Sequence, residues 1–392
     1  MTSKPVAPRA EAVIDLTAIR HNVELLSALA ARSGAATMAV VKADGYGHGA
    51  VPVAAAALGA GASWLGVCTI AEALQLRAGG ITAPILSWLD LPDDDYTPAV
   101  AAGVDLGVAT IRQLAAVRAA AVAADRPARV HLKIDTGLSR NGATAAEWPD
   151  LVVASAKVVA EGLLDVVAVW SHLAHADSPC HPVLDRQAAR LDDAWRRAVE
   201  IGLRPMRHLA NSAATMTRPD LHYDLVRPGI AVYGLDPTGP PPSRFGLRPA
   251  MTFRTRVALV KRMPAGEGVS YGHEWVTPVE TTLALLPVGY ADGVPRRLGS
   301  QPSGVGGLRV LLGGRTRPVV GRVCMDQIVV DCGDDPILEG EPAVLFGSGS
   351  QGEPTARDWA EALGTIHYEI VTGLRSARVS RTVFDREPLG AT

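Results

Sequence analysis

The chain has 392 residues, of which 48% are hydrophobic and 20% charged, with a formal net charge of −2 and an isoelectric point near 6.6. This length exceeds what one ordinary hydrophobic core needs, so two domains are expected, and the near-neutral charge offers no basic face for nucleic acid. Four scattered cysteines, an N-terminus without an apolar segment and the lack of an apolar run of about 18 residues predict a cytoplasmic protein without a membrane partner.

The first two thirds of the chain alternate helical patterns with short apolar runs. Leu16, Ile19, Val23, Leu26 and Ala30 recur at helical spacing, with Thr17 as a candidate helix cap. Eight strands are predicted, at Met38–Val41, Trp64–Cys68, Ile85–Trp88, Leu106–Val108, Val130–Ile134, Val166–Trp170, Arg207–Leu209 and Leu225–Val226. This order predicts an α/β protein with an N-terminal (β/α)8 TIM barrel over residues 10–248. A doubly wound sheet is the alternative, but no G-x-G-x-x-G follows the first strand.

Near residue 236 the composition of the chain changes. The segment Asp236–Ser243 has too much proline for a helix or a central strand and is predicted to be a linker. Beyond it, Met251–Lys261 alternates, Leu283–Val288 is apolar and Val319–Cys332 is rich in valine and isoleucine. Gly313-Gly314 and the segment Gly333–Pro336 predict turns. A mostly-β C-terminal domain is therefore expected over residues 249–384.

The first predicted strand ends in a lysine. Lys42 follows the apolar residues Met38–Val41 and precedes a glycine-rich loop that carries Tyr46 and His48. A lysine at the tip of a buried strand is poorly hydrated, which disfavours its ammonium form. The neutral amine can attack a carbonyl group and hold a cofactor as a Schiff base. The alternative is a lysine that only ends a strand.

Other candidates follow from the rule that barrel active sites lie at the carboxyl ends of the strands. The rule selects Tyr46, Trp88, Lys133, Asp135, Arg140, Ser171, His172, His175, Asp177, His208, Asn211, Ser212, Arg227, Gly229 and Ile230. Barrel phosphate sites form after strands seven and eight, where Ser212 and the amides of Gly229 and Ile230 suit a phosphate dianion. A lysine facing such a phosphate site fits pyridoxal 5′-phosphate, which has an aldehyde at one end and a phosphate at the other. Arg227 would then lie near the ring of this cofactor.

The histidines after the sixth strand also allow a metal interpretation. His172 and His175, with Asp177 nearby, have a spacing that can bind zinc. Histidines three positions apart need a helix or tight turn to share an ion, however, and His172 is predicted at a strand end. A hydrogen-bonding role for His172 is therefore favoured, and no metal site is predicted.

Motifs along nearly the whole chain resemble those of alanine racemase, a fold-type III pyridoxal-phosphate enzyme. They occur in family order at residues 40–49, 135–140, 171–174, 210–213, 227–234, 269–272, 289–293, 323–327 and 368–370. Any one of these motifs is weak, but the ordered series makes chance similarity very improbable. The resemblance implies interconversion of L-alanine and D-alanine by a two-base mechanism on a pyridoxal phosphate aldimine, supplying D-alanine for peptidoglycan.

The resemblance also implies a role for each matching residue. Lys42 forms the aldimine and is the base on the D-side, and Tyr271 is the base on the L-side. The implied cofactor-binding residues are Tyr46, Trp88, His172, Ser212, Arg227, Gly229, Ile230 and Tyr368, and the implied substrate-binding residues are Arg140, Met325 and Tyr290. Lys133 matches a lysine that can be carbamylated. The family is a head-to-tail homodimer in which Tyr271 and Met325 enter the partner chain's site.

Two further implications concern protonation. Arg227 keeps its proton, so a ring nitrogen beside it stays unprotonated, which limits transamination and decarboxylation. A chain from Tyr271 through His172 to Arg227 is a hypothesis for lowering the pKa of the tyrosine.

Three alternatives remain open at the level of the sequence. A fold-type III decarboxylase shares the barrel and the lysine and usually needs a cysteine acid, for which Cys324 is a candidate. A non-catalytic pyridoxal-phosphate carrier lacks the β domain that supplies Tyr271 and Met325 here. A racemase acting on serine or another amino acid is the third alternative.

Overall fold

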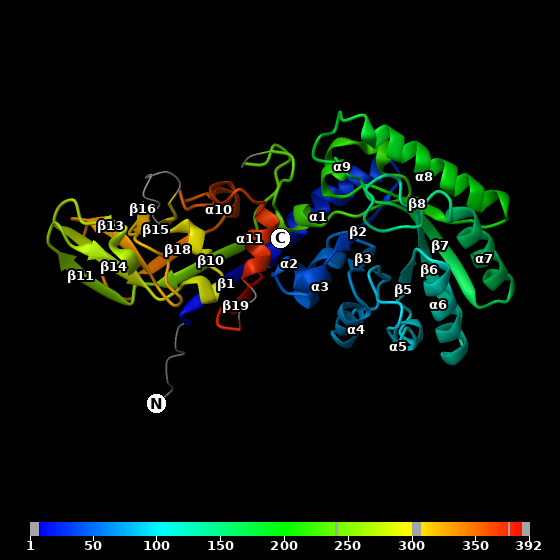
Figure 1. Cartoon of the computed structure of the whole chain (residues 1–392), viewed down its shortest axis with the longest axis horizontal. Helices are drawn as coiled ribbons and strands as arrows, with labels where there is room; N and C mark the ends of the chain where they lie inside the picture. Colours follow the sequence, from blue (N-terminus) through cyan, green and yellow to red (C-terminus); the bar gives the residue numbers. More distant parts are fainter. Residues whose placement is uncertain (1–7, 240–241, 300–306, 375–376, 386–392) are drawn as a thin grey trace, which may run out of the picture. The chain divides into compact units, whose positions relative to one another are not determined.

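A computed structural model describes residues 8–239, 242–299, 307–374 and 377–385 (Figure 1). The chain forms two compact units, one of Ala18–Leu247 and one of Met1–Thr17 with Arg248–Thr392. The predicted linker includes residues 240–241, which lie outside the described residues. Among the described helices, none has the length and apolarity that crossing a membrane requires.

The first unit is a parallel barrel, as the sequence predicted. Its eight-stranded sheet has the order β8-β7-β6-β5-β4-β3-β2-β9. The strands are β2 (Ala36–Val40), β3 (Trp64–Val67), β4 (Ile85–Ser87), β5 (Asp105–Val108), β6 (Ala128–Lys133), β7 (Leu164–Trp170), β8 (Met206–His208) and β9 (Leu225–Val226). Backbone bonds from Asp224 N–H to Arg207 O (3.1 Å) and from Arg227 N–H to Ala210 O (2.9 Å) close the barrel between β8 and β9. All eight predicted strands are confirmed, because buried parallel strands are nearly continuous apolar runs.

Helices connect these strands. They are α1 (Leu16–Ala31), α2 (Lys42–Tyr46), α3 (Ala50–Gly59), α4 (Ile70–Ala78), α5 (Thr97–Ala101), α6 (Ile111–Ala123), α7 (Trp148–Ala160), α8 (Val183–Glu200) and α9 (Ser212–Thr217), with 3-10 turns η1 (Pro219–Leu221) and η2 (Ile230–Tyr233). The predicted cap at Thr17 is wrong, because Thr17 lies inside α1. Its N–H donates to Asp15 Oδ1 (2.8 Å), so Asp15 satisfies this helix end.

The second unit is mostly β, with a nine-stranded sheet of order β11-β14-β17-β16-β15-β18-β10-β1-β19 and a two-stranded sheet β12-β13. The strands are β1 (Ala10–Asp15), β10 (Met251–Arg256), β11 (Leu259–Met263), β12 (Gly268–Val269), β13 (Trp275–Val276), β14 (Thr281–Leu286), β15 (Arg309–Leu312), β16 (Arg315–Val320), β17 (Ile328–Gly333), β18 (Pro342–Phe346) and β19 (Ser380–Phe384). The helical elements are α10 (Ala356–Leu363), α11 (His367–Gly373), η3 (Tyr271–His273), η4 (Tyr290–Asp292) and η5 (Arg296–Leu298).

The structure differs from the sequence prediction at the start of the chain. Residues from 10 onward were assigned to the barrel domain, but β1 pairs antiparallel with β10 and parallel with β19 in the second unit. Its burial alternates, with Ala10, Ala12 and Ile14 buried, which is the period of a strand with one covered face. The N-terminal strand therefore belongs to the sheet of the C-terminal unit.

Two long segments predicted to be rich in β structure each contribute to two strands. Met251–Lys261 forms β10 and part of β11, because Val257 and Ala258 redirect the chain from partner β18 to partner β14. Val319–Cys332 ends β16 and forms most of β17, and the intervening loop carries Cys324 and Met325. The predicted turn at Gly313-Gly314 is confirmed, and both residues have positive φ (59° and 70°), as a two-residue hairpin turn requires.

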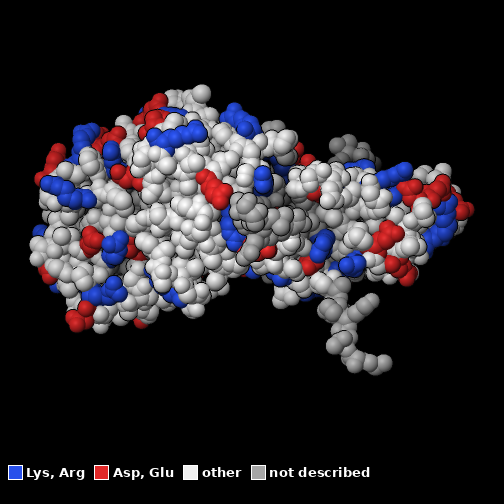
Figure 2. Space-filling model, turned by 180° about the vertical axis from the view of Figure 1, so that it is seen from behind, with Lys and Arg blue, Asp and Glu red and all other residues white. Residues whose placement is uncertain are grey.

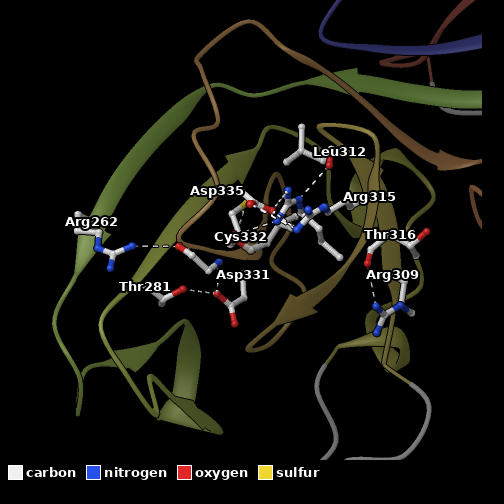
Figure 3. A network of polar contacts seen from close by, with 12 residues as sticks. Arg262, Thr281, Arg309, Leu312, Arg315, Thr316, Asp331, Cys332 and Asp335 are labelled. Atoms are coloured by element: carbon white, nitrogen blue, oxygen red, sulfur yellow. Dashed lines mark hydrogen bonds and ion pairs between the residues drawn. The ribbon is translucent and has the colours of Figure 1, made fainter.

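A buried arginine organises part of the second unit. Arg317 is 6% exposed and donates to Leu312 O (2.9 Å), Cys332 O (2.8 Å) and the carboxylate of Asp335 (2.7 Å) (Figure 3). These bonds tie β15, β17 and the following turn together, and they satisfy a charge that would be costly to bury alone. Elsewhere on the surface, the face in Figure 2 shows basic and acidic side chains interspersed.

Candidate active site

The lysine at the carboxyl end of β2 begins a left-handed turn. Ala43, Asp44, Gly45 and Tyr46 have φ of 56°, 53°, 61° and 50°. Each non-glycine residue in this conformation costs roughly 1–2 kcal/mol, so the turn persists only because its surroundings hold it. Strain of this kind is concentrated at functional sites.

Two aromatic rings flank the half-buried amine of Lys42. Nζ lies 5.9 Å from the ring centroid of Tyr46 and 5.9 Å from that of Trp88. Burial lowers the pKa of Lys42, and the charge of Arg140 lowers it further, against the opposite effects of Cys68 and Glu72. The fraction of neutral, nucleophilic amine is therefore raised.

Polar groups that follow β8 and β9 form a candidate anion-binding site, which we call the cradle. Ser212 Oγ accepts bonds from the N–H groups of Gly229 (2.8 Å) and Ala231 (3.2 Å), which occupies both of its lone pairs and leaves its proton to donate. A Cβ at Gly229 would lie 2.5 Å from the hydroxyl oxygen of Tyr46, so only glycine lets that hydroxyl approach. The Gly229 amide, predicted to face a phosphate, is bonded to Ser212, while Ile230 begins η2 beside it.

Arg227 is buried under the barrel mouth. Its guanidinium donates to Ser171 O (2.8 Å), His208 Nδ1 (2.9 Å) and His172 Nδ1 (3.3 Å). Burial lowers the pKa of Arg227 to about 9, so it remains protonated at neutral pH. Burial and the charges of Arg227 and Arg140 lower the pKa of His172 well below its ordinary value, so His172 is neutral.

A chain of polar groups leads from this arginine through the barrel interior. Because arginine only donates, His208 carries its proton on Nε2, which donates to His131 Nδ1 (2.8 Å). His131 Nε2 then donates to Asp105 Oδ2 (3.2 Å), and Arg129 donates to the same carboxylate (2.7 Å). Burial would raise the pKa of Asp105, but these bonds lower it overall. The carboxylate thereby fixes the tautomer of each histidine.

Lys133 is the second lysine of the site. It is 6% exposed, and its Nζ lies 4.3 Å from the centroid of the Trp170 ring. Burial and the charges of Arg227, Arg140 and Lys42 lower its pKa to about 7. The mouth of the barrel thus gathers four basic side chains, an arrangement that favours anionic ligands.

Three predicted site residues of the second unit share one exposed region. Tyr271, Met325 and Tyr290 are 71%, 52% and 42% exposed. Their loops are joined by bonds from Ser270 Oγ to Arg322 O (2.9 Å), from Tyr290 N–H to Cys324 O (3.0 Å) and from Ala291 N–H to Met325 O (3.0 Å). Tyr368 lies in α11, half-buried, with its ring 5.1 Å from that of His367.

Sequence reasoning missed Glu72, Asp105 and His131. A signal for Glu72 exists, because the run from Thr69 to Glu72 is a capping-box pattern. His131 lies two positions before Lys133 on β6, and strand alternation places both on one face.

The fold and these groups define a class of protein: a parallel-barrel enzyme with a half-buried amine of lowered pKa and several basic side chains at the carboxyl ends of its strands. The profile of the alanine racemase N-terminal domain matches residues 14–237, and that of the C-terminal domain matches residues 250–383. The chain belongs to the alanine racemase family, whose members are pyridoxal-phosphate-dependent isomerases.

Individual relatives agree over the full length. The alanine racemase of Salinispora arenicola is 58% identical, over 97% of this chain and 100% of that protein. The crystal structure of alanine racemase from D-cycloserine-producing Streptomyces lavendulae is 49% identical with a TM-score of 0.92, covering 97% of this chain and 98% of that one. The alanine racemase of Bacillus anthracis, solved with bound L-Ala-P, is 34% identical with a TM-score of 0.85, over 97% of this chain and 96% of that one.

Proposed function

We propose that the protein interconverts L-alanine and D-alanine, with Lys42 and Tyr271 as the two bases. The observation that carries this proposal is the placement of Lys42, an amine of lowered pKa, at the end of the strand that pairs with β9, near a cradle made by Tyr46, Ser212 and Gly229. Racemisation removes a proton from one face of Cα and returns one to the other, so bases on opposite faces are a chemical requirement. The product D-alanine is an expected supply for peptidoglycan.

The residues present fit pyridoxal 5′-phosphate. When bound, this cofactor supplies an electron-withdrawing ring that acidifies the Cα–H bond of an attached amino acid. Lys42 would bond to the carbonyl carbon of the cofactor, and Arg227 would donate a hydrogen bond to the nitrogen of its ring. The other residues that would hold it are Tyr46, Ser212, Gly229, Ile230 and Tyr368 at the phosphate, with Trp88 and His172 lining the site.

Arg227 would limit how strongly the cofactor ring withdraws electrons. With a pKa of about 9, Arg227 stays a hydrogen-bond donor at neutral pH, so it would donate a bond to the ring nitrogen and would not protonate it. Neutral His172 cannot protonate it either. An unprotonated ring withdraws electrons less strongly, which would favour return of the proton to Cα over transamination and decarboxylation.

We further propose that Lys133 is carbamylated and orients Arg140 toward the substrate carboxylate. A pKa of about 7 leaves a large fraction of the amine neutral, the form that attacks carbon dioxide. The nitrogen bonds to the carbon of carbon dioxide and releases a proton, and Arg227 and Arg140 favour the resulting anion. The intact mass of the native protein tests this, since the adduct adds one carbon dioxide.

The active form that we propose is a homodimer with composite sites. Tyr271, Met325 and Tyr290 are strongly exposed in one protomer although two of them are aromatic, which is typical of a surface that a partner covers. In the dimer, Tyr271 and Met325 would enter the partner's barrel, and Tyr290 would narrow the entrance.

A racemisation assay with complementing variants tests these proposals. Lys42→Ala and Tyr271→Phe are each expected to abolish conversion in both directions. When the two variants are unfolded and refolded together, half of the dimers are expected to be hybrids. Each hybrid has one intact site, made of Lys42 from one chain and Tyr271 from the other, and one site that lacks both residues. About a quarter of the wild-type rate is therefore expected to return. Full activity of Tyr271→Phe would refute the two-base mechanism, and no recovery on mixing would refute the composite site. Carbon dioxide release from basic amino acids would instead indicate a decarboxylase, and serine conversion a broader racemase.

A further inference from the structure

We propose that Glu72 is a positioning residue for the active-site lysine: its carboxylate ties the backbone turn that carries Lys42 to the loop after β3. This inference rests on the proposed role of Lys42. Glu72 itself lies outside the cradle and outside the proposed substrate-binding residues.

The carboxylate of Glu72 joins the ends of two neighbouring strands. Oε1 accepts the N–H of Ala43 (2.7 Å), the residue directly after Lys42. Oε2 accepts the N–H groups of Cys68 (2.7 Å) and Thr69 (3.3 Å), where the chain leaves β3. A single side chain thus fixes the loop after β2 to the loop after β3.

An ordinary helix cap does not explain the bond to Ala43. Thr69 and Glu72 form a reciprocal capping box at the start of α4, which uses Glu72 Oε2, the Thr69 hydroxyl and the N–H groups of both residues but not Oε1. The bond from Oε1 reaches a residue 29 positions earlier in the chain. Bonds to a carboxylate are about twice as strong as neutral ones, so this bond can offset the left-handed conformation of Ala43 (φ 56°, ψ 47°).

Glu72 also acts on Lys42 through its charge. The titratable and charged groups near Lys42 include Tyr46, Cys68 after β3, Glu72 on α4, Lys133 on β6, Arg140 after β6 and His172 after β7. Burial, the largest effect, lowers the pKa of Lys42, as does Arg140, whereas Cys68 and Glu72 raise it. Without the carboxylate, the amine would lose a group that stabilises its ammonium form.

Competitive labelling of the amine tests this proposal without relying on catalysis. The full-length protein, freed of cofactor by dialysis against hydroxylamine, is treated with trace acetic anhydride over the pH range in which lysine titrates. Acetylation of Lys42 is then measured by peptide mass spectrometry. In Glu72→Gln the pKa of Lys42 is expected to fall, so that the midpoint of its acetylation curve moves to lower pH.

Two further variants separate the loss of a capping box, the loss of charge and the loss of the bonds between the two loops. Asp358→Asn removes the acid of a similar capping box, Thr355–Asp358 at the start of α10, and is expected to lower thermal stability without moving the pKa of Lys42. Glu72→Asp keeps the charge but is too short to reach both loops. In the holoenzyme it is expected to raise the primary isotope effect from Cα-deuterated D-alanine more than that from L-alanine.

The outcomes distinguish this inference from the proposed function. An unchanged Lys42 pKa in Glu72→Gln, or an equal change in Asp358→Asn, would overturn the role of Glu72 even if racemisation is confirmed. A lowered pKa in a protein that does not racemise alanine would support the effect of Glu72 on the amine and refute the proposed function instead.

Discussion

Replacing Lys133 by methionine is expected to stabilise the folded protein at neutral pH and to do so much less at alkaline pH. Burial, followed by the charge of Arg227, lowers the pKa of Lys133 from 10.5 to about 7. Between these values the unfolded chain binds more protons than the folded protein, so the free energy of unfolding rises with pH. At about 1.4 kcal/mol per pKa unit, the buried amine costs at most about 5 kcal/mol near pH 6.5 and less than about 1 kcal/mol near pH 10.

The assay is urea unfolding of the wild type and Lys133→Met at equal protomer concentration, in buffers free of carbon dioxide so that no carbamate forms. Methionine has a similar length and no charge, so the volume of the site is nearly kept. The stability difference between the two proteins is expected to shrink by about 4 kcal/mol between roughly pH 6.5 and 10. Lys157→Met, at an exposed position of α7, controls for the exchange itself. A difference that is the same at both pH values would refute the argument that burial lowers the pKa of Lys133.

Two other substitutions test the cradle and the β unit. Gly229→Ala is expected to weaken binding of pyridoxal 5′-phosphate about tenfold in equilibrium dialysis, because its Cβ would lie 2.5 Å from the Tyr46 hydroxyl oxygen. Gly59→Ala, where nothing lies within 4 Å of the added carbon, is the control, and equal affinities would contradict the predicted clash. Arg317→Ala is expected to lower the free energy of unfolding by about 3 kcal/mol, since it removes a buried side chain and leaves the buried carbonyl groups of Leu312 and Cys332 without this donor. Arg315→Ala, whose side chain is 72% exposed, should change it by less than about 0.5 kcal/mol, and similar losses in both variants would be inconsistent with this reasoning.

The barrel was predictable because its signal is local. Most of its strands are short runs rich in apolar residues, and each strand is followed by a segment that carries polar groups. The strand β1 was not predicted, because its partner β10 lies about 240 residues further along the chain. A six-residue alternating segment becomes a strand only when such a distant partner is supplied.

The sequence predicted the candidate site residues that follow strand ends but not those that lie within strands. Lys42, Ser212 and Arg227 follow strand ends, so the barrel rule selects them by position alone. His131 and Asp105 lie within strands and face the interior, where sequence patterns predict apolar residues. Their function in orienting His208 follows from contacts between different strands.

For Lys42, the residue pattern alone indicates its place at the end of β2 and the family motif around it. The pattern does not give the ionisation state of Lys42 or of Lys133, nor the bond from Ala43 to Glu72. These properties depend on the folded structure, because desolvation and charge act through space. The burial and the neighbours that set a pKa come from strands that the chain order keeps far apart.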